Sequence, residues 1–187
     1  MASSARASSG SASRAWGCLS EGRPSTASPM TTIHCAYDGA LRCSSRHGPS
    51  SSLVETDAPI DNQGKGERFS PTDLVATALA TCILTVMGIV AQRHGWNLEG
   101  ASAQVNKTMT TEGVRKIALL EVWIALPASL DDRARAVLRE AGEGCPVKRS
   151  LEGAVPMALH WSSLPSENDH PPSPSHPSPS QPATGDG

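Results

Sequence analysis

The chain has few aromatic residues and little net charge. Its 187 residues include one Phe, one Tyr and four Trp, and the formal net charge is −2. Surfaces that bind nucleic acids combine concentrated positive charge with aromatic side chains on which bases stack. No basic cluster interleaved with aromatic residues occurs in this sequence. We therefore expect no nucleic-acid partner.

The sequence also lacks the cysteine patterns of metal sites and disulfide frameworks. It contains no CxxC pair and no regular Cys/His spacing. Structural zinc sites depend on such spacings, and secreted disulfide scaffolds use close, even-numbered cysteines. The five cysteines are Cys18, Cys35, Cys43, Cys82 and Cys145. We expect no metal, no cofactor, and a reducing compartment, the cytoplasm.

The first 29 residues have almost no large apolar side chains and no apolar run of the kind found in secretory signals. Such a segment cannot bury enough surface to offset the entropy of ordering it, so we predict a disordered leader over residues 1–29. We favour a misassigned start, with Met30 as the first residue. The alternative is an organellar transit peptide, which the three arginines and the single acid of the segment resemble and which would move the protein to an organelle.

The other end of the chain is rich in Ser, Pro and His. Residues 164–187 have the low-complexity composition of a disordered tail. Residues 30–163 remain, which is a usual size for one domain.

The middle of the chain alternates strand-like and helix-like segments. Ser70, Pro71 and Asp73 form a helix start of the capping-box type, and the long helix that follows should end near His94-Gly95. Helices set against antiparallel strands define an α+β class. The remaining predicted segments are strands 31–37 and 40–44 around an Asp38-Gly39 turn, strand 52–57, hairpin strands 101–110 and 114–126, a helix from Ser129 to Gly142, a short helix from Pro146, and strand 155–161.

The long helix carries no charge from Leu74 to Ala91. A bilayer span needs about 20 strongly apolar residues, and threonines at 77, 81 and 85 weaken the hydrophobicity here. A helix without a charged face is better explained as a buried central helix. Because a domain this small cannot surround it alone, we expect a homodimer and no membrane.

Two cysteines stand out by their setting. Cys145 precedes Pro146 at a helix start, where free N–H groups and the nearby Lys148 and Arg149 would stabilise a thiolate. Cys82 lies mid-helix among apolar residues, where burial makes a thiol unreactive. These local arguments favour Cys145 as the reactive thiol and Cys82 as a packing residue.

Cys35 and Cys43 flank the first predicted turn. With Asp38-Gly39 as the loop, Cys35 faces Arg42 and Cys43 faces His34, so the two thiols are not opposite each other. We expect both to be inert strand residues.

The combined pattern resembles the OsmC/Ohr family of osmotically inducible and organic hydroperoxide resistance proteins, in its OsmC-like branch. The resemblance rests on the loop 57–66, the helix start 70–74, Cys82 in the helix, and Gly144-Cys145-Pro146-Val147. It implies an intertwined homodimer with an antiparallel sheet and the Cys82 helix buried at its centre.

The resemblance also implies a chemistry. Cys82 would attack the O–O bond of an organic hydroperoxide and become a sulfenic acid, and Cys145 would condense with it to a disulfide. A dithiol such as a lipoyl group would reduce the pair. This implication reverses the roles favoured by the local arguments.

One position departs from the family pattern. Family hydroperoxidases carry Glu directly after the helix-start Pro, paired with an activating Arg, whereas this chain has Thr72. Arg68 is our first candidate for the activating cation, followed by Arg42. The departure keeps open an alternative, a stress or binding protein with little peroxidase activity. A hydrolase using Cys145 with His94 is a weaker alternative.

Overall fold

The computed structural model describes residues 30–164. The predicted leader, with Cys18, lies outside the described residues, as does the predicted tail beyond Leu164. The elements in chain order are β1 (Ile33–Gly39), β2 (Arg42–His47), β3 (Leu53–Asp57), the 3-10 turn η1 (Ile60–Asn62), α1 (Pro71–His94), β4 (Ser102–Met109), β5 (Ile117–Leu126), α2 (Asp132–Glu143), α3 (Pro146–Leu151) and β6 (Met157–Ser163). This mixture confirms the α+β class.

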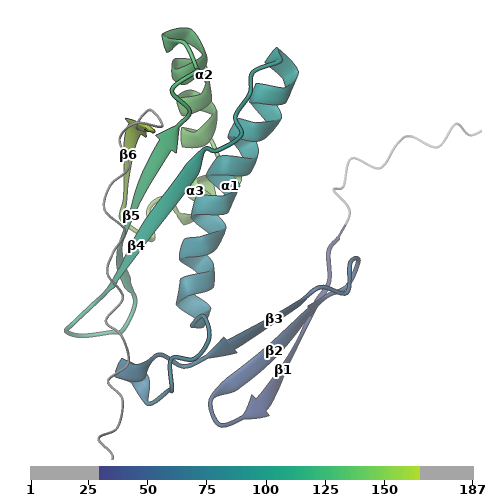
Figure 1. Cartoon of the computed structure of the whole chain (residues 1–187). Coiled ribbons are helices and arrows are strands. Elements are labelled where there is room, and N and C mark those ends of the chain that lie inside the picture. The colour runs from purple at the N-terminus through teal and green to yellow at the C-terminus, as the bar shows by residue number, and fades with distance from the viewer. Residues whose placement is uncertain (1–29, 165–187) are drawn as a thin grey trace, which may run out of the picture.

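The strands form two separate three-stranded sheets, β1-β2-β3 and β4-β5-β6 (Figure 1). The first sheet is antiparallel throughout, whereas β6 runs parallel to β5. The prediction of an antiparallel sheet is therefore wrong for the last strand. The connection from β5 to β6 contains both α2 and α3. It is thus long enough to return the chain to the starting end of β5, as parallel pairing requires.

The first hairpin turns two residues later than predicted. An irregularity between Tyr37 and Gly39 lets Gly39 pair with Arg42, and the loop residues 40 and 41 both have positive φ. Tyr37 consequently faces Cys43, and Cys35 faces Ser45. The predicted partners were wrong, although the two cysteines still do not face each other.

Helix α1 begins and ends where the sequence indicates. The Ser70 hydroxyl accepts from the Asp73 N–H, and the Asp73 carboxylate accepts from the Ser70 N–H, so the capping box is complete. At the other end Gly95 is left-handed, and its N–H bonds to helix carbonyls. These local signals fix both ends of the helix.

Helix α2 begins later than predicted. Its N-cap is Asp131, whose carboxylate accepts from the Ala134 N–H, rather than Ser129. The helix extends through Gly142 to Glu143, one residue past the predicted stop. Asp131 prevails because a carboxylate at the N-cap adds a favourable charge to the capping bond.

One face of α1 packs into the core. Ala76, Leu79, Ile83 and Met87 are buried there, together with the apolar residues of β5 and with Leu138 of α2. The helices α1 and α2 thus form a layer over the second sheet (Figure 1). The buried positions of α1 recur every three or four residues, as expected for one face of a helix.

The opposite face of α1 is exposed in the single chain. This face carries Ala78, Thr81, Thr85 and Ile89. Only 33% of the most apolar 18-residue stretch of α1 is buried. By length and composition alone α1 is apolar enough to cross a membrane, a test that core helices also pass. The predicted all-round burial is therefore not achieved by one chain.

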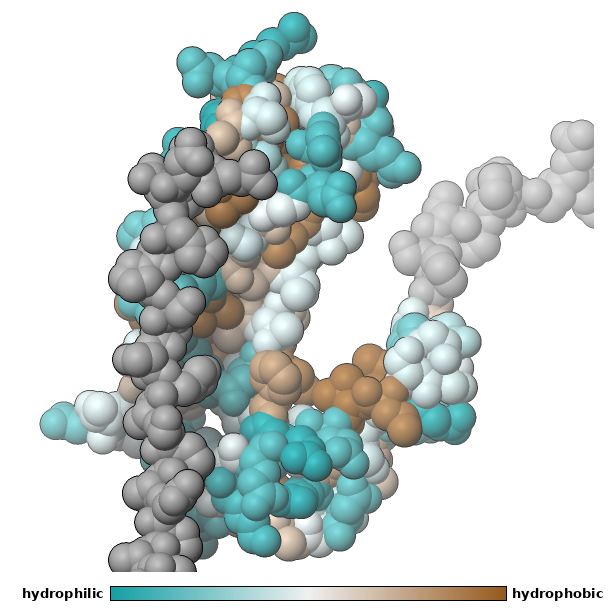
Figure 2. Space-filling view, viewed as in Figure 1, coloured by the Kyte–Doolittle hydropathy of each residue, from teal (hydrophilic) through white to brown (hydrophobic). Residues whose placement is uncertain are grey.

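The first sheet stands apart from the helical layer (Figure 1). Large apolar side chains remain uncovered on it, including Ile33 at 60% and Leu53 at 70% exposure. Figure 2 shows hydrophobic residues facing a hollow between this sheet and the rest of the molecule. The single chain therefore leaves large apolar side chains of this sheet open to solvent.

Candidate functional site

The fold brings Cys82 and Cys145 together across the contact between α1 and α3. Cys82 packs against the buried cluster that includes Cys145, and its proximity raises the pKa of Cys145. Both cysteines are free thiols. Residues 63 positions apart in sequence thus form one dithiol, where α3 lies beside α1.

Cys145 is the N-cap of α3, as predicted, but it is not an activated thiol. Its Sγ accepts the Lys148 backbone N–H at 3.3 Å, and the residue is fully buried. Burial raises the pKa of Cys145 most strongly, the Lys148 N–H lowers it, and Cys82 raises it again, so the net shift is upward. The local argument for a Cys145 thiolate is therefore wrong, because desolvation outweighs the helix end.

The predicted cations beside Cys145 are occupied elsewhere. Lys148 Nζ pairs with Glu152 at 2.9 Å and with Glu143 at 3.4 Å, and these carboxylates raise the Lys148 pKa. Arg149 pairs with Glu152 at 3.6 Å. Lys148 and Arg149 are therefore paired with surface carboxylates rather than with the Cys145 sulfur.

Gly142 lets the turn that carries Cys145 approach α1 closely. A Cβ added there would lie 2.8 Å from the Trp161 ring and 3.1 Å from Ile83. The Gly142 carbonyl also accepts the Cys145 N–H at 3.1 Å. Because Gly142 has no side chain, the turn can place Cys145 against the surface of α1 that bears Cys82.

Cys82 is half-buried at the edge between the core face and the exposed face of α1. It therefore adjoins both the buried Cys145 and the open side of the helix. The pair is asymmetric, with one thiol sealed inside and the other at the boundary.

The candidate cation Arg68 is not brought to Cys82 within one chain. Cys82 comes 11 residues after Pro71, which places it about 16 Å along the helix from its start. Arg68 precedes that start, is exposed, and bonds to Glu55 at 3.1 Å. Its catalytic role stays a prediction.

Arg42, the second candidate, helps to hold the loop before α1. It pairs with Glu67 and lies 3.8 Å from the carboxylate of Asp57. The buried Asp57 carboxylate accepts the Glu67 N–H at 3.0 Å. This hydrogen bond is the strongest reason that the pKa of Asp57 is lowered.

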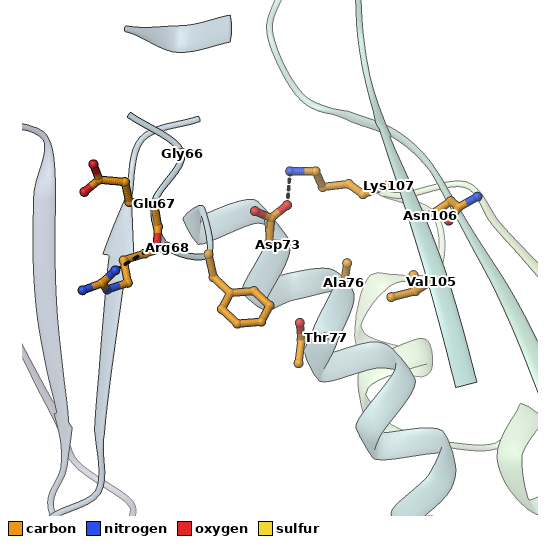
Figure 3. A pocket seen from close by; sticks show the side chains of 10 residues that line it. Gly66, Glu67, Arg68, Asp73, Ala76, Thr77, Val105, Asn106 and Lys107 are labelled. Carbon is orange, nitrogen blue, oxygen red and sulfur yellow. Dashed lines mark hydrogen bonds and ion pairs between the residues drawn. The ribbon is translucent and has the colours of Figure 1, made fainter. Parts of the chain in front are cut away.

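A cavity of about 790 Å³ lies at the start of α1 (Figure 3). Lys107 of β4 enters it and donates to Asp73 at 2.6 Å and to Thr72 at 2.8 Å. The cavity residues are Gly66, Glu67, Arg68, Phe69, Asp73, Ala76, Thr77, Val105, Asn106 and Lys107. Neither Cys82 nor Cys145 lines this cavity, so within one chain the cavity is separate from the dithiol.

The sequence analysis missed Lys107. Alternate residues of β4, namely Ala103, Val105, Lys107 and Met109, are less exposed than those between them. The signal available in the sequence was that Lys107 alternates with the apolar Ala103, Val105 and Met109 on one face of the strand. It places a positive charge beside Thr72, at the position where the family pattern has Glu.

Two further expectations concern side-chain clusters. Within residues 30–164 no group of three His, Cys, Asp or Glu side chains could hold a metal ion. His94 stacks on Trp96 at the far end of α1, 12 residues beyond Cys82, so the fold does not bring it to Cys145. The Cys145–His94 hydrolase has no geometric support.

The fold and the paired thiols define an α+β dithiol protein, and the comparisons identify its family. The family model described as OsmC-like protein matches residues 64–160. A solved structure from Psychrobacter arcticus, named for osmotic stress induction and detoxification response, is 38% identical, with TM-score 0.66, and the match covers 73% of this chain and 98% of that one. The chain belongs to the OsmC-like family.

More distant structures share the fold. An organic hydroperoxide resistance protein OsmC from Legionella pneumophila is 19% identical, with TM-score 0.58, over 74% of this chain and 99% of its own. An organic hydroperoxide resistance protein from Elizabethkingia anophelis is 15% identical, with TM-score 0.59, over 73% and 99%. A search among curated proteins found no significant match.

Proposed function

We propose that this protein is a thiol-dependent peroxidase that reduces organic hydroperoxides to alcohols. The observation that carries the proposal is the packing of a half-buried Cys82 against the buried cluster that contains Cys145, with both thiols free. The boundary thiol suits an attacker that must meet substrate, and the sealed thiol suits a partner that closes a disulfide. The family membership supports the same reading.

The reaction has two steps. The Cys82 thiolate attacks the O–O bond, forming Cys82 sulfenic acid and releasing the alcohol. Cys145 then condenses with the sulfenic acid, forming the Cys82–Cys145 disulfide and releasing water. The raised pKa of Cys145 is consistent with this order, because Cys145 stays protonated until the sulfenic acid forms.

The functional unit in this proposal is a homodimer. A second copy would cover the exposed face of α1 and the open first sheet, which one chain leaves uncovered. Within one chain Arg68 precedes the start of α1, whereas Cys82 lies about 16 Å along the helix from that start. In this proposal Arg68 therefore acts as the activating cation from the partner subunit. A dithiol such as a lipoyl group recycles the disulfide, in the cytoplasm, or in an organelle if residues 1–29 direct the protein there.

The test is consumption of cumene hydroperoxide with a lipoamide-coupled reductant, compared with hydrogen peroxide. Cys82→Ser should abolish turnover, and Cys145→Ser should stop it after one sulfenic acid per chain. Cys35→Ser, which removes an exposed thiol outside the pair, is the matched control and should retain activity. Untouched Cys82 and Cys145 thiols with unconsumed hydroperoxide would overturn the proposal.

The second candidate is a stress or binding protein of the same fold with little peroxidase activity. Thr72 in place of Glu favours it, because Lys107 binds Thr72 and Asp73 rather than a catalytic acid. It predicts that Cys82→Ser leaves hydroperoxide consumption unchanged. The same assay therefore separates the two candidates.

A further inference from the structure

The two sulfurs of a Cys82–Cys145 disulfide differ in access. Cys145 has no exposed surface even in the single chain, so a partner subunit could only cover it further. Cys82 lies at the edge of the exposed face of α1. The proposed function requires that a hydroperoxide reach the Cys82 sulfur, whereas Cys145 offers no surface to an incoming molecule.

Thiol–disulfide exchange requires the incoming thiolate to reach one sulfur while the other sulfur leaves. Attack on Cys145 would bring the thiolate through the core in which that residue is packed. Attack on Cys82 makes Cys145 the leaving group. The Lys148 backbone N–H, 3.3 Å from the Cys145 Sγ, is already placed to stabilise the departing thiolate.

We infer that the reductant attacks the Cys82 sulfur, so that the mixed disulfide of the recycling step forms on Cys82 and never on Cys145. This inference rests on the proposed function and assigns the step that restores the enzyme. The reductant thiolate bonds to Cys82 Sγ as the Cys82–Cys145 bond breaks, and the electron pair goes to Cys145 Sγ, which takes up a proton.

The second thiol of the reductant completes the exchange. It displaces Cys82 from the mixed disulfide, and the reductant leaves as a cyclic disulfide. Two electrons and two protons have then moved from the dithiol to the protein, and both cysteines are thiols again. Cys82 therefore meets both the hydroperoxide and the reductant, one after the other.

The inference is tested by trapping the mixed disulfide on the full-length protein. The disulfide is formed with cumene hydroperoxide and, in a parallel sample, with diamide. Each sample is pulsed with 2-mercaptoethanol, a monothiol, quenched in acid and digested with trypsin. Cys82 falls in the peptide 69–93 and Cys145 in 140–148, so mass spectrometry distinguishes them.

We expect the adduct on 69–93 in an excess on the order of tenfold or more, because access governs the exchange rate. The control is the same pulse in guanidinium chloride, where unfolding exposes both sulfurs and the preference should collapse. An equal or larger adduct on 140–148 in the folded protein would overturn the inference. So would failure of both oxidants to form the disulfide.

The two oxidants separate this inference from the proposed function. A disulfide that forms with diamide but not with hydroperoxide would contradict the peroxidase proposal alone. The adduct position in the diamide sample would still decide which sulfur is attacked.

Discussion

The two thiols of the pair, considered as single residues, differ in burial and in the charges around them. Cys145 has a helix start and neighbouring cations, yet burial raises its pKa and carboxylates neutralise those cations. Cys82 lies in an apolar stretch of sequence, yet it is at the edge of the exposed face of α1. Desolvation and access, which depend on tertiary packing, set the character of both cysteines.

Gly142 offers a direct test of how the pair is held together. We expect Gly142→Ala to lower the free energy of unfolding by about 1–3 kcal/mol, because the added methyl overpacks against Trp161 and Ile83. Displacement of the Cys145 turn should also slow disulfide formation. Urea unfolding and thiol quantification after an oxidant pulse measure the two effects.

Gly144→Ala is the matched control, since a Cβ there meets its nearest atoms at 3.5 Å and the φ of Gly144 is negative. It should unfold and oxidise nearly as the wild type does. Equal effects of the two substitutions would show that close packing at Gly142 does not position Cys145.

At the element scale, α1 begins with a capping box that is tied to β4. Lys107 donates to Asp73, Thr72 and Ser70, so one ammonium links the strand to the first turn of the helix. Cations are usually unfavourable at a helix N-terminus. Here Asp73 supplies the compensating charge, and the element junction depends on that carboxylate.

The pH dependence of stability should report this junction. Burial raises the pKa of Asp73, but hydrogen bonds from Lys107 and Ser70 outweigh it, and the net pKa is lowered. A lowered folded-state pKa stabilises the protein above the ordinary carboxyl range and loses that stability as the pH falls through the lowered value. The contribution should be about 1 kcal/mol or less, because the side chain is partly exposed.

Asp73→Asn should therefore reduce stability near neutral pH and flatten its decline in acid, as followed by urea unfolding across the acid range. Asp132→Asn is the matched control. Asp132 occupies the first turn of α2 but has no ion pair in the described part of the chain. An acid decline in Asp73→Asn as steep as in the wild type would contradict the role of this pair.

At the scale of the whole molecule, the single chain leaves two apolar surfaces open. They are the outer face of α1 and the β1–β3 sheet (Figure 2). Gly88 lies on the helix near the exposed residues, and a Cβ there would meet nothing within 4 Å. A larger side chain at position 88 thus has room in one chain, but it would obstruct a closely packed second copy.

We expect the wild type to sediment as a dimer and Gly88→Leu to sediment as a monomer with its helix content retained. Gly88→Ala is the matched control, because it gains similar helix propensity, about 1 kcal/mol, while staying small. Sedimentation velocity and circular dichroism measure the two quantities. A monomeric wild type at micromolar concentration would contradict the dimer proposal.

Much of the fold could be predicted because its signals are local. The capping box at Ser70, the left-handed Gly95 and the cap at Cys145 each depend on a few adjacent residues, and the structure confirms them. The parallel β6, the later turn of the first hairpin and the Asp131 cap were missed. The parallel β6 depends on pairing between distant strands, and the later hairpin turn depends on a bulge. The start of α2 depends on a choice between two nearby capping residues, Ser129 and Asp131.

Local signals in the sequence were enough to predict the α+β class, the ends of α1, Cys82 in the middle of α1 and Cys145 at the start of α3. Long-range packing was needed to establish that Cys145 is fully buried, that Cys82 lies at the boundary, and that Lys107 reaches the start of α1. Helix ends follow from hydrogen bonds within a turn of the chain. Burial and ion pairing depend instead on which distant segments pack together, and here that packing converts two separate cysteines into one dithiol.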